Sequence, residues 1–217
     1  MADHMGAFQG ETGEYFEPVA WSPADNHHDR IRMRWRLCTA QGDVSVIGTD
    51  VGSLDPDGRF REIAGFVLAP DAVPSQDAGC RGPDASDWSQ FPTIVRKYGD
   101  AWMAIGNLDA LIILNEIWAE DGYYVDPFVQ APVIGRFALS NHMSNAMAPG
   151  HYVEVKAWSA DNLHHDRLWI PWRHCCPTGA ILLEGDDIGE IDHDGRLSRV
   201  TSFWNNEVDL PADVACD

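Results

Sequence analysis

One phrase of sequence occurs twice in this chain, as HHDRIRMRWR at 27–36 and as HHDRLWIPWR at 164–173. The likeness continues on both sides, because 13–67 can be laid on 150–204 without a gap. The shared residues include tryptophans, both histidines, several glycines and one aspartate that stands between two glycines. Self-similarity of this kind indicates a duplicated structural unit, so we expect both copies to fold alike.

The two copies are not equally complete. Apolar residues at helical spacing precede the second copy in two stretches, and these are Ile94, Tyr98, Trp102 and Ile105, then Leu108, Leu111, Ile112, Asn115 and Trp118. A short strand, YYVDP at 123–127, and a third helix around 134–147 follow. Only 1–12 precede the first copy. The sequence therefore predicts one and a half tandem units, divided into an incomplete sheet unit at 1–68, a Pro, Gly, Asp and Ser-rich linker at 69–90, a complete unit at 91–208 and a tail at 209–217.

Alternation along the strands assigns their faces. The strands predicted in the second copy are at roughly 151–159, 167–175, 180–191 and 196–204, and the last two form a hairpin around DHDG. Asp187 interrupts an otherwise apolar face, with a glycine two residues away on each side, and Asp50 does the same in the first copy. Burial of such a carboxyl raises its pKa and favours the protonated form, which donates a hydrogen bond. The flanking glycines let a ligand or a backbone approach. The alternative is an aspartate that accepts hydrogen bonds from a neighbouring strand.

A stripe of arginines follows the other face of the strand that contains the first phrase. Its members are Arg30, Arg32, Arg34 and Arg36. Four guanidinium groups are too polar for a core, so we hypothesise that they pair with Glu184, Asp186 and Glu190 on the outer face of the second copy. The two sheets would then pack against each other within one chain. The alternative is a charged face in water.

Composition excludes several classes of partner. The chain of 217 residues has a formal net charge of −19, which repels nucleic acid and anionic membrane surfaces, so we expect neither partner. It has no apolar run long enough to span a membrane, and its first residues lack the basic start and apolar core of a secretory signal. The five cysteines show no framework spacing, which favours reduced thiols and a cytoplasmic location.

The order of elements resembles a known superfamily. A helix pair, a strand ending in Asp-Pro, a helix opening with Gly-Arg and four strands ending GDDIGEIDHDGRL are similar to nuclear transport factor 2-like proteins, and more narrowly to SnoaL-like polyketide cyclases and ketosteroid isomerase-like members. The resemblance covers 91–208 as a whole unit and 1–68 as the back half of one. It implies an α+β cone, in which a curved antiparallel sheet wraps around helices and encloses a pocket. It also implies a homodimer through the outer sheet faces, unless the half unit supplies that face within the chain. The half unit could instead borrow helices from the middle of the chain or from a partner.

Two acids carry over from the isomerase-like pattern. Asp126 of YVDP matches the general base, and Asp187 matches the oxyanion-binding acid by its spacing to Gly195. Tyr98 lies near the position of the catalytic tyrosine. The carboxylate base beside a protonated carboxylic acid in ketosteroid isomerase is itself a well-known example of pKa tuning.

We expect one pocket per chain. The substrate-binding residues expected around these three are Trp102, Trp172 and His174, with His165 at the pocket mouth as a proton carrier. We expect no metal and no cofactor, since adjacent histidines on an extended chain point to opposite sides and rarely bind one ion. His142 on the third helix is interpreted as packing, and Cys175 has no base that would make it a nucleophile.

Two functions remain open from the sequence. The first is an enzyme of isomerase or lyase type, an isomerase, cyclase or dehydratase, which uses metal-free acid–base chemistry on an apolar carbonyl or polycyclic substrate. Asp126 would take a proton, and protonated Asp187 would donate to the developing enolate oxygen. The second is a non-catalytic module of the same fold that binds a hydrophobic ligand or dimerises. A filled cone, or acids held by backbone hydrogen bonds, would favour the module.

Overall fold

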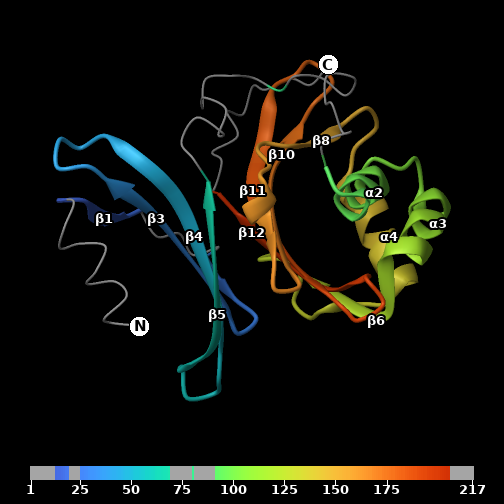
Figure 1. Cartoon of the computed structure of the whole chain (residues 1–217). Coiled ribbons are helices and arrows are strands. Elements are labelled where there is room, and N and C mark those ends of the chain that lie inside the picture. Colours follow the sequence, from blue (N-terminus) through green and yellow to red (C-terminus); the bar gives the residue numbers. More distant parts are fainter. Residues whose placement is uncertain (1–12, 20–24, 69–79, 81–90, 206–217) are drawn as a thin grey trace. The chain divides into compact units, whose positions relative to one another are not determined.

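The computed structural model describes 13–19, 25–68, 80 and 91–205 of the chain (Figure 1). The chain divides into two compact units, Met1–Val73 and Pro74–Asp217. Apart from Cys80, the predicted linker lies outside the described residues, and so does the predicted tail. Within the described part of the chain, no helix is both long enough and apolar enough to cross a membrane.

The first unit is an antiparallel sheet. Its strands are β1 (Tyr15–Pro18), β2 (Asn26–His27), β3 (Arg30–Cys38), β4 (Val44–Leu54) and β5 (Phe60–Leu68). Their order is β1-β3-β4-β5, and β2 pairs with the start of β3. A turn closed by the Gly58 N–H, which donates to the Asp55 carbonyl oxygen at 2.9 Å, joins β4 to β5. The described residues of this unit include no helix, as the prediction of a half unit requires.

The described part of the second unit combines three α-helices with a mixed sheet. The helices are α2 (Thr93–Trp102), α3 (Asn107–Ile117) and α4 (Arg136–Ala146). The strands are β6 (Trp118–Val125), β7 (Val133–Ile134), β8 (Tyr152–Val155), β9 (Leu163–His164), β10 (Arg167–Cys175), β11 (Ile181–Ile191) and β12 (Leu197–Trp204). The order is β7-β6-β12-β11-β10-β8, and only the β6–β12 pairing is parallel. In Figure 1 this sheet curves around the helices, so the α+β prediction is confirmed.

The core of the second unit lies between the helices and the concave face of the sheet. Each helix contributes to it, with Val95 and Tyr98 from α2, Leu114 from α3, and Leu139 from α4. The sheet contributes Leu168, Ile170, Leu197 and Val200, and these four side chains are at most 3% exposed. Burying this apolar surface is the main source of the unit's stability.

The predicted helix faces need a correction. Helix α2 ends at Trp102, so Ile105 falls in the following turn and is 93% exposed. In α3 the predicted face points outward, because Leu108 and Ile112 are 67% and 62% exposed. The buried face carries Ala110, Leu114 and Ile117 instead. Both sides of α3 are apolar, and periodicity alone does not tell which side faces the core.

The repeated phrase begins with a hairpin turn in both units. His28 and Asp29 link β2 to β3 with φ of 50° and 62°, and His165 and Asp166 link β9 to β10 with φ of 49° and 58°. Positive φ at both central residues characterises the type I′ turn, whose twist matches that of the strands it joins. The start of the phrase therefore has a structural role.

The arginines of the stripe form ion pairs with carboxylates of the first unit itself. Arg32, whose side chain is fully buried, donates from Nε to Asp25 Oδ1 at 2.7 Å. Arg34 reaches the other oxygen of Asp25 at 3.5 Å, and Arg36 lies 3.0 Å from Glu17. In the second unit Asn162 replaces Asp25 and donates to the Trp169 carbonyl oxygen at 2.8 Å.

The acidic outer face of the second sheet also has local partners. Glu184 accepts a hydrogen bond from Arg173 Nε at 2.7 Å and lies 3.2 Å from Lys156 Nζ. Glu190 accepts from Arg199 at 3.0 Å. The packing of one sheet on the other stays a prediction.

Candidate functional site

A cavity of about 280 Å³ lies inside the second unit. Helices α2 and α4 and the strands of the curved sheet supply its wall. The predicted site residues that line it are Tyr98, Trp102, Asp126, Trp172, His174 and Asp187. Most of the remaining wall is apolar or aromatic, with Phe128, Tyr124 and Trp204 among it. A cavity of this kind binds a small, largely apolar molecule and orients it through a few polar groups.

Asp187 is the acid on the sheet side of the cavity. It lies on β11, and only 4% of its surface is exposed. The Tyr98 hydroxyl donates to Oδ2 at 2.8 Å, and the Trp172 indole N–H donates to Oδ1 at 2.8 Å. Burial raises the pKa of Asp187 to about 6, although the hydrogen bonds from Ser202, Tyr98 and Trp172 act in the opposite direction. Near neutral pH this carboxyl therefore exchanges a proton readily.

Gly185, two residues before Asp187, lets a backbone approach, which was one of the two predicted alternatives, because a Cβ there would lie 2.5 Å from the Phe203 carbonyl oxygen. It also leaves room for a side chain. A Cβ on Gly185 would lie 2.4 Å from the Trp172 ring, which crosses the strand at this point. The first unit repeats the arrangement, since a Cβ on Gly48 would lie 2.2 Å from the Trp35 ring. Asp50 is buried in part, and this burial raises its pKa. A hydrogen bond from Trp35 acts in the opposite direction. The space beside the glycine is filled by a tryptophan of the protein and not by a ligand.

Asp126 is the second acid of the cavity, and it directly follows the last residue of β6. Its Oδ1 accepts the backbone N–H groups of Phe128 and Val129 at 2.7 and 3.0 Å. Its Oδ2 lies 3.3 Å from His142 Nε2. Burial alone would raise the pKa of Asp126, but the hydrogen bonds from His142 and from the two backbone N–H groups outweigh it and lower the pKa. Asp126 is therefore an ionised carboxylate.

His142 is a residue whose role the sequence prediction missed. It projects from α4, lines the cavity and packs against the Trp102 and Tyr124 rings at 6.0 and 5.1 Å between centroids. Because ionised Asp126 has no proton to donate, Nε2 of His142 carries the hydrogen of their contact. Nδ1 of a neutral His142 is then a proton acceptor. No motif in the sequence joins His142 to Asp126, since the contact depends on how α4 packs against β6.

Two further polar residues of the cavity were not predicted. Tyr124 interacts with both acids. Its pKa is raised well above the ordinary value, mainly by burial and then by the charges of Asp187 and Asp126. Ser202 lies directly opposite Asp187 in the β11–β12 register and hydrogen-bonds to it. Strand alternation contained the signal for Tyr124, because it stands two residues before Asp126.

His174 and His165 have different surroundings. His174 lines the cavity, and its Nε2 lies 3.0 Å from His151 Nδ1. Burial, and then the charge of His151, lowers the pKa of His174 to about 4, so this imidazole is neutral at physiological pH. His165 lies in the hairpin turn against His164, at 3.2 Å between Nδ1 atoms, and is not among the residues that line the cavity.

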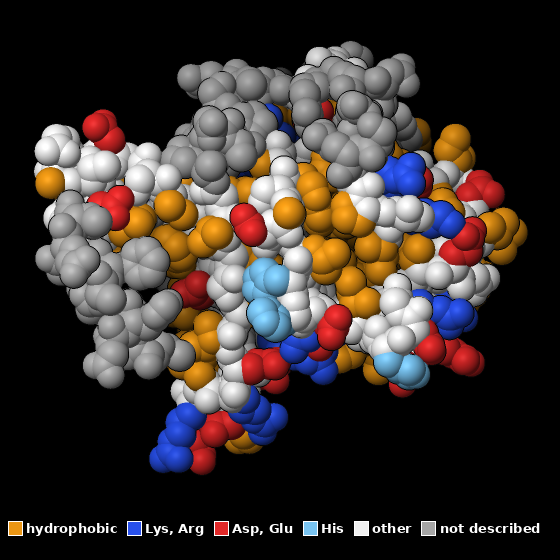
Figure 2. All heavy atoms as spheres, in the orientation of Figure 1, with side chains coloured by type: hydrophobic (Ala, Val, Ile, Leu, Met, Phe, Trp, Pro, Cys, Tyr) orange, Lys and Arg blue, Asp and Glu red, His pale blue; other side chains and the backbone are white. Residues whose placement is uncertain are grey.

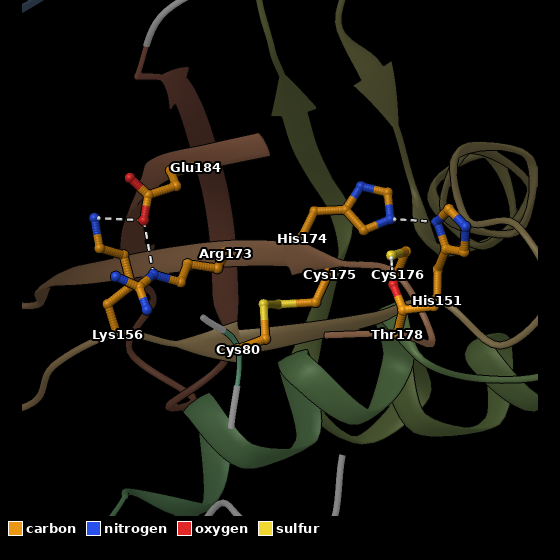
Figure 3. The surroundings of a disulfide bond; sticks show 9 residues. All are labelled: Cys80, His151, Lys156, Arg173, His174, Cys175, Cys176, Thr178 and Glu184. Atoms are coloured by element: carbon orange, nitrogen blue, oxygen red, sulfur yellow. Dashed lines mark hydrogen bonds and ion pairs between the residues drawn. A yellow bond between two sulfur atoms is a disulfide. The ribbon is translucent and has the colours of Figure 1, made fainter. Parts of the chain in front are cut away.

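A disulfide bond is formed by Cys175, which directly follows the cavity-lining residue His174 (Figure 3). Cys80 is bonded to Cys175, with 6.3 Å between the Cα atoms, and the Cys80 N–H also donates to the Gly179 carbonyl oxygen at 3.1 Å. The prediction that all cysteines are reduced is therefore wrong for this pair. The linker carried no spacing signal, and the fold alone brings Cys80 to β10. Cys38 and Cys176 are free and buried, and Cys216 lies outside the described residues.

Among the described residues, the disulfide and a neighbouring glutamate form a group with the spacing of metal ligands. In Figure 3, His174 and His151 face each other on one side, and Lys156 and Arg173 converge on Glu184 on the other. Ligand atoms of Cys80, Cys175 and the buried Glu154 lie within 4.8 Å of one another. In this structure the two sulfur atoms are bonded to each other and are not available as thiolate ligands.

Searches against family models and against curated proteins find no match. Solved structures that match part of the chain include a proposed isomerase of the SnoaL-like family from Agrobacterium tumefaciens, at 26% identity over 52% of this chain and 96% of that chain, with a TM-score of 0.48. Another match is a hypothetical protein of ketosteroid isomerase-like fold from Catenulispora acidiphila, in complex with trimethylamine. It is 19% identical over 52% of this chain and 86% of that chain, with a TM-score of 0.43. A proposed polyketide cyclase from Sinorhizobium meliloti matches at 21% identity over 54% and 99%, with a TM-score of 0.41. Each of these matches covers about half of this chain.

Proposed function

We propose that the second unit is an acid–base catalyst of isomerase or lyase type for a small, largely apolar carbonyl compound. The observation that carries the proposal is the pair of acids in one cavity, of which Asp126 is held ionised by hydrogen bonds while burial favours the protonated form of Asp187. Two carboxyls whose environments drive their pKa values apart suit opposite tasks, one in accepting a proton and the other in donating one.

The proton acceptor in this proposal is the pair of Asp126 and His142. Three hydrogen bonds lower the basicity of Asp126, which makes it a weak base by itself. His142 keeps Nδ1 as an acceptor when its Nε2–H faces Asp126. A proton taken from the carbon beside the substrate carbonyl would produce an imidazolium, and the adjacent carboxylate would stabilise that charge.

The hydrogen-bond donor is the pair of Asp187 and Tyr98. As the proton leaves carbon, negative charge develops on the carbonyl oxygen of the substrate. A protonated Asp187, in hydrogen-bond contact with the Tyr98 hydroxyl, can donate to that oxygen in a largely apolar cavity. Return of a proton to a different carbon completes an isomerisation, and loss of a leaving group completes an elimination.

The test is proton exchange by NMR. A panel of apolar ketones and enones in D₂O is incubated with the wild type, with Asp126→Asn, with His142→Gln and with the surface control Asp194→Asn. The proposal predicts loss of an α-proton signal with the wild type and the control. Both site variants should slow this loss by roughly 10²–10⁴-fold, which is the usual contribution of a positioned acid–base group.

A second candidate, a ligand-binding module without catalysis, is favoured by one observation. Both backbone N–H groups after β6 donate to Asp126 Oδ1, which is how a purely structural aspartate would hold a turn. The same experiment separates the candidates. Broadened ligand signals without any exchange of α-protons would favour binding alone and count against catalysis.

A further inference from the structure

The inner face of the first unit is the counterpart of the cavity wall in the second. We use this name for the face of β3, β4 and β5 that carries Trp35, Asp50, Phe60, Ile63 and Val67. Trp35 stands opposite Gly48 and Met33 opposite Asp50, just as Trp172 stands opposite Gly185 and Ile170 opposite Asp187. The two faces therefore share one register.

The two faces differ in what covers them. Phe60 and Ile63 are 46% and 40% exposed, whereas their counterparts Leu197 and Val200 are each 0% exposed. Leu197 and Val200 pack in one core cluster with residues of α2, α3 and α4, and the first unit has no described helix. The inner face therefore has the apolar pattern of a sheet face covered by helices, and the described residues of the first unit supply no such helix.

The second unit also has an apolar helix face that is exposed and packs against no described element. Ile105, Leu108 and Ile112 follow one another at a spacing of three and then four residues, which aligns them along α3 and the turn before it. These side chains are 93%, 67% and 62% exposed. Helix α3 is the outermost helix in Figure 1, and Figure 2 shows hydrophobic side chains on this margin of the molecule. We call Ile105, Leu108 and Ile112 the α3 stripe.

We propose that the α3 stripe of a second copy of this chain covers the inner face of the first unit, in a reciprocal homodimer. A helix is what the same sheet face accepts in the second unit, and the stripe is an apolar helix face of the required kind. Both faces occur on one chain and both are exposed there. A two-fold pair uses each face once per copy and leaves none of them in water.

The contact also suits the charge of the protein. At a formal net charge of −19 two copies repel each other, so a stable pair needs an interface with few charges. The three side chains of the stripe are uncharged. Of the two acids beside them at helical spacing, Glu116 is paired with Lys97 and Asp109 is exposed. On the inner face Asp50 has a raised pKa because it is partly buried, which reduces the cost of covering it.

The first test is the size of the full chain in solution, by sedimentation across a concentration series. The proposal predicts a species of twice 24.1 kDa for the wild type. Ile112→Asp and Ile63→Asp, on the two sides of the proposed contact, should each weaken dimerisation by at least about 30-fold, the effect of losing one central interface residue. Ile134→Asp is the matched control, because Ile134 is 63% exposed on β7, and it should leave the dimer intact.

The second test maps the contact and does not depend on how the variants fold. A chain that carries a photo-crosslinking residue at position 112 is mixed with an isotopically heavy wild-type chain. Crosslinked peptides are then identified by mass spectrometry. Crosslinks from position 112 to Phe60–Leu68 of the heavy chain are expected. A monomer at every concentration, crosslinks only to α3 of the other chain, or a dimer that neither aspartate variant weakens would each overturn the proposal.

Discussion

The Trp172 indole lies across Gly185 and donates its N–H to Asp187 Oδ1 at 2.8 Å. This relationship fixes where the acid on β11 points and leaves the carboxyl in an otherwise apolar wall. Trp35, Gly48 and Asp50 repeat it in the first unit. The duplicated Trp, Gly and Asp positions therefore specify a three-residue arrangement across two neighbouring strands, and it is retained even where the chain has no described helices to complete a cavity.

The stability of the second unit should depend on pH through Asp187. Its folded-state pKa of about 6 lies above the ordinary value of 3.8, so between these two values the folded protein binds more protons than the unfolded protein. The free energy of unfolding should therefore fall as the pH rises from about 4 to 6, by about 3 kcal/mol at most. In Asp187→Asn this contribution to the fall should be absent, while the contributions of other carboxyls with raised pKa values, such as Asp50 and Asp100, remain.

Urea unfolding at several pH values measures this effect. Asp194→Asn is the control, since its side chain lies in the exposed turn between β11 and β12. The control should keep the wild-type dependence on pH. Parallel curves for the wild type and Asp187→Asn between pH 4 and 6 would show that Asp187 has an ordinary pKa.

Gly48→Ala should destabilise the first unit by about 1–3 kcal/mol. The added Cβ would lie 2.2 Å from the Trp35 ring, and the three nearest atoms all belong to that ring. The test is a double-mutant cycle by urea unfolding, with Trp35→Leu as the second change. Because leucine lacks these ring atoms, Gly48→Ala should cost much less in that background. An equal cost in both backgrounds would mean that the glycine is needed for another reason.

Loss of the disulfide should destabilise the second unit by about 2–4 kcal/mol, because the bond joins positions 95 residues apart and restricts the unfolded chain. Cys80→Ser should lower the midpoint of thermal unfolding, and a reducing agent should lower that of the wild type by a similar amount. The reducing agent should have no further effect on Cys80→Ser, which is the internal control. Labelling of every cysteine in unfolded, unreduced protein would contradict the bond.

Much of the second unit could be predicted from its sequence because its patterns are local. Alternation placed Asp187 on the inner face of β11, and the turn sequence DHDG placed the last hairpin. The resemblance brought Tyr98, Asp126 and Asp187 to one cavity, and the structure places them there.

The rest depended on packing between distant segments. The pairing of Cys80 with Cys175 and the contact of His142 with Asp126 join elements whose approach no local pattern encodes. The face of α3 was misassigned for a related reason. Its two sides are similarly apolar, so only the packing of the whole unit decides that Leu114 is buried and Ile112 exposed.

The central claim is that one cavity holds an ionised carboxylate and a second carboxyl that exchanges its proton near neutral pH. The most direct measurement is a carbon-13 NMR titration of the aspartate carboxyl groups, with signals assigned from Asp126→Asn and Asp187→Asn. If this claim holds, Asp187 titrates near pH 6 and Asp126 remains ionised to below its ordinary pKa of 3.8. A titration of Asp187 at or below 3.8, or of Asp126 above Asp187, would contradict it.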